Sequence, residues 1–463
     1  IRIEENCISE VSIGHGDTHC NGKSVTRLKL KSGESFFYKP HDMSVDVKFY
    51  KLLDILHKTA KLWDFNAPKI FVGKGYGCVA KVDKKSCETE AEVKRYYQRC
   101  GELLAIFYSI NTVDIHFENI IASGEYPIVI DLETLFNPKL VSPIIDNKNS
   151  ALIKAVDAYS VSVMSIGMLP LYMETGVEVG GLGGDAVQVT QSRVDKCVVN
   201  KKDGILIKKI TTEIEPENNI PIFNEIKVKT VDYISELLLG FDMTYRWIIG
   251  HKEEYFNNVK SLFSNVSCRL IIRSTRQYGR LLGTSLHQEF SRKPFERDII
   301  LYRILIDQYE DYPTISRREF EDLRQGDIPY FTFKINSSKI YDSNNNEMSG
   351  AEIEDVFEYV KTKIESFSLE DLKRQEEYIQ ASFISKRNIT DYTGLEFIEY
   401  NNKLEPDKWV ETAKEIGDFL IEKMIIGIND FGNADGVWNC VTLQGLEEDT
   451  WVPTVLSNEM YSG

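Results

Sequence analysis

The sequence predicts an α+β fold in which a strand-rich beginning is followed by a mainly helical remainder. Residues 25–39 and 67–82 each contain two β-prone runs around a glycine-containing turn, which predicts two β-hairpins. From residue 90 to residue 110 the apolar residues recur at helical spacing, and helical spacing returns from about residue 231. Residues 112–136 lie between these stretches and contain two short apolar runs around a turn, which predicts a third hairpin.

The overall composition is that of an ordinary globular protein, with 42% hydrophobic and 27% charged residues in a chain of 463. A formal charge of −16 argues against general binding to DNA or RNA, because such binding needs a basic surface. No apolar run approaches the ~20 residues of a membrane-spanning helix, so we expect no transmembrane segment. The eight cysteines are scattered without a CxxC pair, which argues against a zinc knuckle and suits the reducing cytoplasm. The chain starts without an initiator Met, and we expect it to be a piece of a longer protein.

The third hairpin carries polar residues at the spacing that phosphoryl transfer uses. That reaction needs a lysine on the phosphates, an Asp near the accepting hydroxyl, and Asn and Asp ligands for magnesium. Asp114 precedes Asn119 by the spacing that protein kinases use between the catalytic Asp and the metal-binding Asn, and Asp131 follows at the end of the hairpin. Lys39 ends an early strand. A polar loop is the simpler interpretation of any one of these residues, but their combination favours a site for ATP and Mg²⁺.

His116 lies inside the same loop, in the order Asp-x-His-x-x-Asn. Ordinary protein kinases place a His-Arg-Asp sequence here. The order in this chain resembles the loop of lipid kinases instead.

Two glycine-rich segments are candidates for phosphate-binding loops, and a third favours a different role. The segment 73–81 lacks the G-x-G-x-x-G spacing, so we interpret it as a hairpin turn with Lys81 on the surface. The segment 14–25 is the better candidate because its backbone amides can cover bound phosphates, although a glycine-rich entry to a strand explains it equally well. A carboxylate beside phosphates is unfavourable, so Asp17 is expected to orient a neighbour. The glycines at 180–184 favour a mobile loop.

Residues 268–282 carry four arginines in an otherwise acidic chain: Arg269, Arg273, Arg276 and Arg280. Arginine suits bidentate recognition of phosphate. A solvated helix face that pairs with glutamates is the plain alternative for a charge run. The run RLIIR is too apolar for a fully solvated face, so we expect it to be half-buried, with one or more of the arginines directed into a site.

Several longer motifs together resemble the dehydratase domain of class II lanthipeptide synthetases, and the resemblance extends over nearly the whole chain. The motifs are GDTHCNGKSV, FFYKP, DIHFENII, IDLETLF, GGLGGD, RLIIRSTRQYGRLLGTSLH and GDIPYFT. The resemblance implies a lipid-kinase-like bilobal catalytic core with inserted loops and additional C-terminal helices.

The resemblance also implies an activity. Such enzymes use ATP and magnesium to phosphorylate Ser and Thr of a ribosomally made precursor peptide that carries a leader sequence. They then eliminate the phosphate and leave dehydroalanine or dehydrobutyrine. In the full-length protein a C-terminal zinc cyclase domain would close thioether rings, but no zinc-ligand set is expected in this chain. The location implied is cytoplasmic, or peripheral to an export transporter at the membrane.

Roles for individual residues follow from the same resemblance. Lys39 would contact the ATP phosphates, and Asp17 and His19 would belong to the turn that covers them. Asp114 would orient or deprotonate the substrate hydroxyl, and His116 would support this loop.

Elimination of phosphate is associated in the family with an Arg and a Thr, which correspond to Arg269 and Thr275. The residues themselves do not decide which arginine faces the site, so Arg273 stays an alternative. The residues implied for magnesium are Asn119, Asp131 and, as a further ligand or a supporting group, Glu133.

Three regions are expected on these grounds. Residues 1–85 form a β-rich N-lobe, and residues 86–330 form a C-lobe with the catalytic loop, the metal-binding hairpin, a mobile glycine-rich segment and the arginine-rich elimination segment. Residues 331–463 form a helical capping region and a linker into the cyclase domain. Two other functions stay open: an ordinary peptide or small-molecule kinase without elimination, and a non-catalytic, kinase-like scaffold that binds peptides.

Overall fold

The computed structural model describes most of the chain. The described residues are 7–141, 149–170, 177–184, 188–189, 194–200, 204–211, 213–214, 218–290, 292–306, 312–383, 406–429, 431–445 and 449–456.

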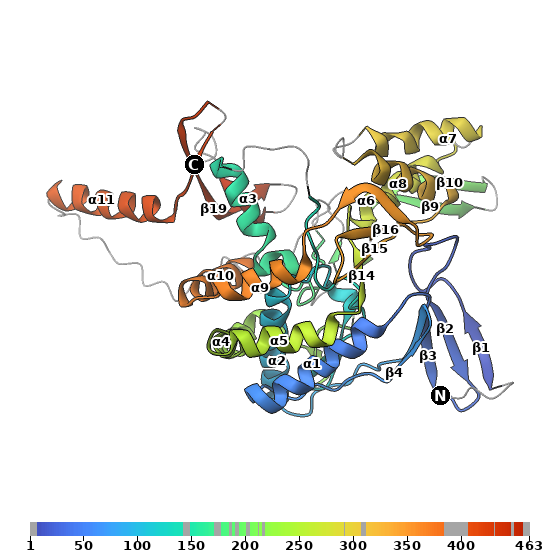
Figure 1. Ribbon diagram of the computed structural model, residues 1–463, viewed down its shortest axis with the longest axis horizontal. Helices are drawn as coiled ribbons and strands as arrows, with labels where there is room; N and C mark the ends of the chain where they lie inside the picture. The colour runs from blue at the N-terminus through green and yellow to red at the C-terminus, as the bar shows by residue number, and fades with distance from the viewer. Residues whose placement is uncertain are drawn as a thin grey trace.

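A five-stranded antiparallel sheet forms the N-terminal part of the fold (Figure 1). Its spatial order is β1-β2-β3-β5-β4, so the two predicted hairpins are confirmed and share one sheet. The segment 14–25 connects β1 to β2, and the strand that precedes it was not predicted. The strands are β1 (Ile8–Ser12), β2 (Thr26–Leu30), β3 (Ser35–Lys39), β4 (Ile70–Gly73) and β5 (Tyr76–Ala80).

Helix α1 (Ser44–Ala60) joins this sheet to the helical part of the fold. Its buried face includes Val45, Phe49 and Leu53, which recur at helical spacing. The helix contacts α5 and β14, and it begins soon after β3 ends at Lys39. The end of β3 and the first turn of α1 therefore lie at the junction between the sheet and the helices.

Two long helices, α2 (Glu90–Ser109) and α4 (Ile234–Gly250), pack against each other at the centre, and the helix predicted from residue 90 is confirmed. Their close approach depends on two glycines. A Cβ atom on Gly101 would lie 2.0 Å from a carbonyl oxygen of α4, and one on Gly240 would lie 2.0 Å from a carbonyl oxygen of α2. Any side chain at either position would force the helices apart.

The third predicted hairpin is also confirmed, as β6 (Ile120–Ser123) and β7 (Tyr126–Val129), with the short helix η1 (Phe117–Asn119) before it. Helix α1 holds the end of this hairpin. The Tyr50 O–H donates to the carbonyl oxygen of Val129 at 2.8 Å, and the Val129 N–H donates to the Tyr50 oxygen at 3.1 Å. The residues that follow β7 are thereby fixed near the end of β3.

Short elements make up most of the middle of the chain, where the described strands pair locally, β9 with β10, β8 with β11 and β12 with β13. These elements are α3 (Ala151–Ser160), η2 (Val163–Ile166), β8 (Gln188–Val189), β9 (Val194–Asn200), β10 (Gly204–Ile210), β11 (Glu213–Ile214), β12 (Ile222–Phe223), β13 (Ile226–Lys227) and η3 (Thr230–Tyr233). Helix α5 (Lys252–Phe263) follows α4.

A second antiparallel sheet, in the order β14-β15-β16-β17, lies beside three helices with a small core of their own (Figure 1, upper right). Strand β14 pairs with β15, so residues on both sides of the expected boundary at residue 330 share one sheet. The elements are β14 (Ser267–Leu270), α6 (Thr275–Ser285), α7 (Pro294–Leu301), η4 (Tyr302–Leu305), α8 (Pro313–Gln325), β15 (Phe331–Lys334), β16 (Lys339–Tyr341) and β17 (Glu347–Glu352).

The region after residue 352 is helical and then returns to strands. Its elements are α9 (Val356–Ser366), α10 (Leu369–Ser382), α11 (Pro406–Lys423), β18 (Ile425–Ile428), β19 (Ala434–Gly445) and β20 (Asp449–Leu456). The main hydrophobic core draws on residues from α1 through α10. The α+β class is therefore confirmed, as helices packed with several small sheets.

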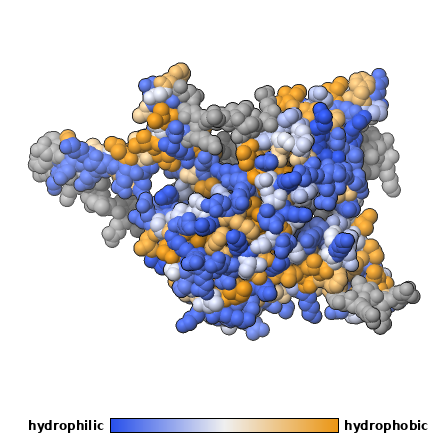
Figure 2. All heavy atoms as spheres, viewed as in Figure 1, coloured by the Kyte–Doolittle hydropathy of each residue, from blue (hydrophilic) through white to orange (hydrophobic). Residues whose placement is uncertain are grey.

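The surface of this fold is mixed in character. The face seen in Figure 2 is largely hydrophilic, as expected for a chain with a formal charge of −16. Exposed apolar side chains also occur, among them Phe295 and Ile299 of α7 and Trp409 and Phe419 of α11. None of the helices in the described ranges combines the length and the apolar character that crossing a bilayer requires.

Candidate active site

Lys39 lies at the end of β3, against the segment that follows β7. Its Nζ donates to the carbonyl oxygen of Ile130 at 2.8 Å and lies 3.0 Å from Oδ1 of Asp131. Burial lowers the pKa of Lys39, but the charges of Asp131 and Asp46 outweigh burial and raise the pKa above its usual value. Lys39 is therefore held as a buried cation beside a carboxylate.

Asp46, which was not predicted as a site residue, is a second acidic neighbour of Lys39. It lies in the first turn of α1 and is 2% exposed. Burial raises the pKa of Asp46 to about 7, although the positive charge of Lys39 opposes the shift. An Asp on the apolar face of a helix, between Val45 and Phe49, is the sequence signal that marks it.

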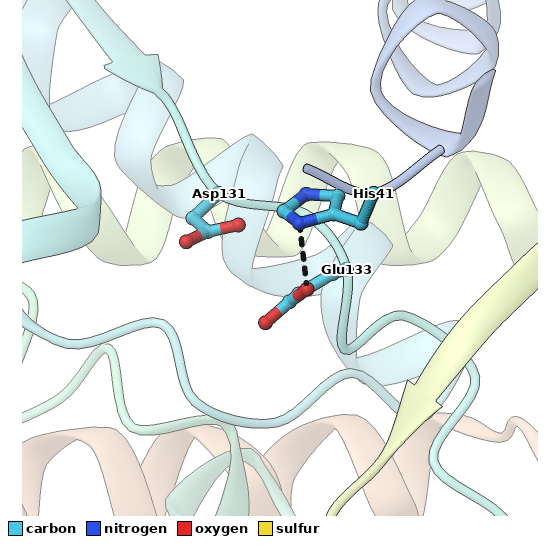
Figure 3. A group of neighbouring side chains, drawn as sticks. All are labelled: His41, Asp131 and Glu133. Atoms are coloured by element: carbon cyan, nitrogen blue, oxygen red, sulfur yellow. Dashed lines mark ion pairs between the residues drawn. The ribbon is translucent and has the colours of Figure 1, made fainter. Parts of the chain in front are cut away.

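Glu133 connects several groups of the site (Figure 3). Its Oε1 accepts a hydrogen bond from Nη1 of Arg269 at 2.8 Å, and its Oε2 accepts one from the O–H of Tyr330 at 2.9 Å. Nδ1 of His41 lies 3.6 Å from Oε2. Burial alone would raise the pKa of Glu133, but Arg269 and His41 outweigh it and hold the pKa well below its usual range. Glu133 is thus a buried anion with both oxygens engaged.

Arg269 enters this site from β14. Its backbone N–H donates to the carbonyl oxygen of Glu133 at 2.6 Å, in addition to the side-chain ion pair. Its guanidinium carbon lies 5.1 Å from the ring centre of Tyr330, within the range of a cation–π contact. Two bonds to one residue and an aromatic face together fix the position of this guanidinium.

The predicted catalytic loop lies beside the same segment. Asp114 has a φ of +67°, a left-handed conformation that is strained for a residue with a side chain. The amide of Asn119 donates to the carbonyl oxygen of Asp114 at 2.8 Å. The Thr134 hydroxyl donates to the carbonyl oxygen of Val113 at 2.7 Å, which ties the loop to the residue after Glu133. These bonds keep the strained residue in place.

The Asp114 carboxylate faces both solvent and cations. Its side chain is 44% exposed, and Nε2 of His116 lies 3.9 Å from its Oδ1. Partial burial raises the pKa of Asp114, while the positive charges of His116 and Arg269 oppose the shift. A raised pKa makes a carboxylate a better proton acceptor near neutral pH.

The glycines at 180–184 pack closely against the predicted catalytic loop. Residues 180–184 are buried, and the N–H of Phe117 donates to the carbonyl oxygen of Val179 at 3.2 Å. A Cβ on Gly181 would lie 2.6 Å from the carbonyl oxygen of Ile115. The sequence favours a mobile loop here, but the described glycines serve close packing against the catalytic loop.

A divalent cation fits the donor groups of the site. One ligand atom each from His41, Asp131 and Glu133 lies within 4.8 Å of the others. The Ile130 N–H donates to the carbonyl oxygen of Asn119 at 3.0 Å, which keeps Asn119 beside Asp131. Magnesium prefers oxygen ligands, so Asp131 is the best suited of the three grouped residues, whereas Glu133 accepts hydrogen bonds from Arg269 and Tyr330.

The segment 14–25 reaches the site through His19. Nδ1 of His19 lies 2.8 Å from the carbonyl oxygen of Ile328, and its ring centre lies 5.2 Å from that of Tyr330. Burial and the charge of Arg269 lower the pKa of His19 below its usual value. Asp17 is exposed, and its charge raises the pKa of His19 slightly against these effects. His19 is therefore an uncharged group at the edge of the site.

Arg273 and Thr275 are the other two predicted site residues of the arginine-rich segment. Arg273 is buried and pairs with Glu319 of α8 at 3.0 Å. Thr275 begins α6 directly after the N-cap Ser274. The expectation that the run RLIIR is at least half-buried is confirmed, since Arg269 and Arg273 are both 8% exposed.

The segment 73–81 is the tight turn of the β4–β5 hairpin and its second strand, as predicted. Lys81 lies on the surface and pairs with Asp83 at 2.6 Å. The lysine that lies with Asp131 is Lys39.

Residues 2–334 match a family that is described as a domain of unknown function, DUF4135. The chain belongs to this family. Every residue of the site described above lies within the DUF4135 match. The chain is also 29% identical, over 487 aligned positions, to the lacticin 481/lactococcin biosynthesis protein LcnDR2 of Lactococcus lactis subsp. lactis. The alignment covers 99% of the chain and 50% of the relative, so the chain spans about half the length of the relative it matches.

Three residues of the site described above were not predicted from the sequence: His41, Asp46 and Tyr330. His41 follows Lys39 by two positions, so a polar residue just beyond a strand-ending lysine was a usable signal. Tyr330 lies in the motif GDIPYFT, which is far from Glu133 in the chain. Nothing in its spacing indicates that the two residues meet.

Proposed function

We propose that this chain carries out ATP-dependent dehydration of Ser and Thr in a lanthipeptide precursor, by phosphorylation and then elimination of phosphate. The name of the relative, a lacticin 481/lactococcin biosynthesis protein, supports a role in lanthipeptide maturation. The proposed architecture is a lipid-kinase-like bilobal core. The five-stranded sheet with α1, followed by α2 and the β6–β7 hairpin, supports it.

One observation carries the proposal. Asp131 pairs with Lys39, and two residues later Glu133 pairs with Arg269. A lysine suited to ATP phosphates and an arginine suited to a departing phosphate therefore belong to a single site. The second cation supports elimination, but arginine also stabilises charge in phosphoryl transfer, so the product is what separates the two functions.

In the first step, the hydroxyl oxygen of the peptide bonds to the γ-phosphorus of ATP while the bond to the ADP oxygen breaks. Lys39 binds the phosphates, and Asp114 orients the hydroxyl and accepts its proton. His116 supports Asp114, and Asn119 with Asp131 would hold Mg²⁺. The cation would neutralise charge on the phosphates.

In the second step, a base removes the α-proton of the phosphorylated residue. The C–H electron pair becomes the Cα–Cβ double bond, and the Cβ–O bond breaks as phosphate leaves with its electrons. Arg269 stabilises the charge on the leaving phosphate, and Thr275 supports this step from the start of α6. Glu133 positions Arg269 through the ion pair and the backbone hydrogen bond.

The substrate proposed is a precursor peptide with a leader sequence, modified in the cytoplasm. In the full-length protein, a zinc cyclase domain would act on the dehydrated product. The two other functions, a kinase without elimination and a peptide-binding scaffold, differ from this proposal in the product that they leave.

The decisive experiment combines the full-length protein with a Ser/Thr-containing precursor peptide, ATP and magnesium, and measures the intact mass of the peptide. Loss of one water per modified residue is expected. A stable gain of phosphate without water loss would mean a kinase only, and an unchanged mass would favour the scaffold. The Asp131→Ala variant is the control, because it should abolish both phosphorylation and dehydration.

A further inference from the structure

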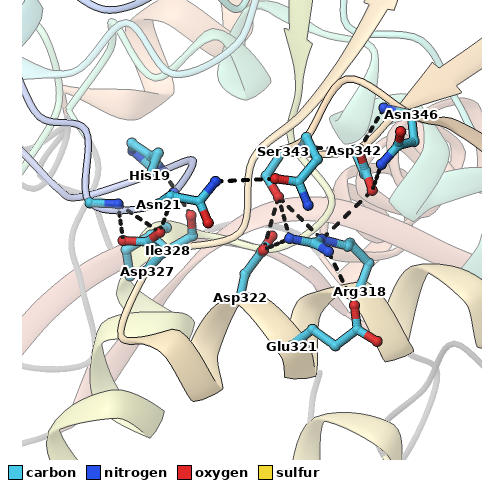
Figure 4. A network of polar contacts seen from close by, with 12 residues as sticks. His19, Asn21, Arg318, Glu321, Asp322, Asp327, Ile328, Asp342, Ser343 and Asn346 are labelled. Carbon is cyan, nitrogen blue, oxygen red and sulfur yellow. Dashed lines mark hydrogen bonds and ion pairs between the residues drawn. The ribbon is translucent and has the colours of Figure 1, made fainter.

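The turn between β1 and β2 is fastened to the connection between α8 and β15 (Figure 4). The carboxylate of Asp327 accepts hydrogen bonds from the backbone N–H of Asn21 at 2.7 Å and from that of Gly22 at 3.0 and 3.1 Å. The Ile328 N–H donates to the carbonyl oxygen of Thr18 at 2.8 Å. Two motifs that lie about 300 positions apart in the chain thus form one contact.

The backbone of this turn is strained, and it is held both by the backbone pair of His19 with Lys23 and by Asp327. Cys20, Asn21 and Gly22 have φ angles of +49°, +69° and +78°, so three consecutive residues are left-handed. For a residue with a side chain this conformation is unfavourable. Such strain persists only where the surroundings impose it. Asp327 binds the amides of two of these three residues, and a charged acceptor makes the stronger kind of hydrogen bond.

Asp327 is itself rigidly placed. It is 5% exposed, and its N–H donates to the carbonyl oxygen of Asp322 at 3.0 Å, just after the left-handed Gly326 that ends α8. Asp322 in turn bonds to Ser343 at 2.8 Å and pairs with Arg318. Asp327 therefore belongs to the second sheet and its helices, whereas the turn that it binds belongs to the N-terminal sheet.

The turn presents His19 to the active site. The ring of His19 packs on the ring of Tyr330. The Tyr330 hydroxyl donates to Glu133, and the Tyr330 ring lies next to Arg269. Release from Asp327 would leave the turn attached to the connection between α8 and β15 through the contacts of Ile328 with Thr18 and His19.

We propose that Asp327 is a positioning residue, whose carboxylate holds the strained turn so that the backbone of the turn covers the phosphates of ATP and His19 stays beside Tyr330. The proposal deepens the proposed function and rests on it for the identity of the nucleotide. Asp327 touches neither substrate nor metal, and it acts by fixing backbone amides.

The test compares Asp327→Ala and Asp327→Asn with wild type in the full-length protein. Two quantities are measured: hydrogen exchange of peptides that cover residues 18–22, and the Kd of ATP with magnesium by calorimetry. Asp435→Ala is the matched control, because both oxygens of Asp435 accept the backbone N–H of Ala151 at 3.2 and 3.3 Å in the region of α3 and β19. Melting temperatures are recorded for all variants.

Asp327→Ala is expected to speed exchange at residues 18–22 about tenfold, while β2 and β3 keep their protection. The Kd of ATP should rise about tenfold or more, in line with the loss of a hydrogen bond to a charged group. Asp327→Asn keeps one carbonyl oxygen for the amides and should lie between Ala and wild type. Asp435→Ala should leave the exchange and the Kd unchanged.

Several outcomes would overturn the proposal. Unchanged exchange in Asp327→Ala would show that the carboxylate does not hold the turn. Faster exchange with an unchanged Kd would show that the turn has no role in binding ATP, and an equal rise in Kd in Asp435→Ala would assign the effect to stability. If the wild type binds ATP but does not modify the peptide, the proposed function is contradicted. The comparison of the Asp327 variants with wild type still tests whether Asp327 positions the turn. A wild type that binds no ATP would overturn both.

Discussion

Arg269 and Arg273 lie four positions apart and are alike in their burial and in having a glutamate partner. Each is 8% exposed, and each pairs with a glutamate, at 2.8 Å for Glu133 and at 3.0 Å for Glu319. Burial and an ion pair therefore do not distinguish the proposed roles of the two arginines, elimination for Arg269 and support of the fold for Arg273.

The surroundings of the two glutamates do distinguish them. Glu133 lies among Arg269, His41 and Lys39, which hold its pKa well below its usual range although burial opposes them. Burial outweighs Arg273 and Tyr278 at Glu319, so the pKa of Glu319 is raised. Two buried cations, Arg269 and Lys39, beside one carboxylate suit a site that receives phosphate. The Arg273–Glu319 pair beside a small hydrophobic core suits a structural role instead.

The variant Arg269→Ala tests the proposed role of Arg269 in elimination, and its expected effect is the largest. We expect elimination to fall about 100- to 1000-fold, because one preorganised donor to the leaving phosphate is lost. Phosphorylated peptide should accumulate, since Lys39 and Asp131 are intact. Intact-mass time courses separate the two products.

Arg269→Lys serves as the control, because it keeps the charge and loses the guanidinium geometry. It should restore elimination only in part. Normal dehydration by Arg269→Ala, without phosphopeptide, would show that the elimination step uses another group.

Arg273→Ala should act on stability instead. Removing one partner of a buried ion pair leaves a buried charge, which costs about 3–5 kcal/mol. We expect a lower melting temperature and an unchanged ratio of phosphorylated to dehydrated peptide per folded enzyme. Arg273→Ala combined with Glu319→Gln should recover part of the loss, and accumulation of phosphopeptide in Arg273→Ala would place Arg273 in the elimination step.

The sequence predicted the parts of the site that are close together in the chain. The spacing of Asp114 and Asn119, the hairpin before Asp131 and the strand that ends at Lys39 are local patterns, and local patterns follow from helix and strand periodicity. The α+β class followed from the same periodicity. The strand β1 was missed because its residues are mostly exposed and show no buried face.

The long-range contacts could not be predicted in this way. Which arginine meets Glu133 depends on the pairing of β14 with β15, and periodicity carries no information about pairing between distant strands. The glycines at 180–184 show the same limit. Their composition is that of a mobile loop, but close approach to another backbone also requires glycine, and only the fold shows which cause applies.

The smallest effect we expect is a difference in pH dependence between the two glutamates. A lowered pKa means that Glu133 contributes stability above the unfolded value of about 4.3, and this contribution is lost as the pH falls through the folded pKa. The raised pKa of Glu319 gives the opposite sign, so its contribution is present below about 4.3 and is lost as the pH rises through the folded value.

Glu133→Gln and Glu319→Gln remove these titrations one at a time. The gap in melting temperature between wild type and Glu133→Gln should shrink as the pH is lowered from neutral toward the acid limit of folding. The melting temperature of Glu319→Gln should instead improve relative to wild type as the pH is raised. Melting curves at half-unit steps of pH measure both trends, and trends of the same sign would show that the two ion pairs do not differ in charge balance as their surroundings indicate.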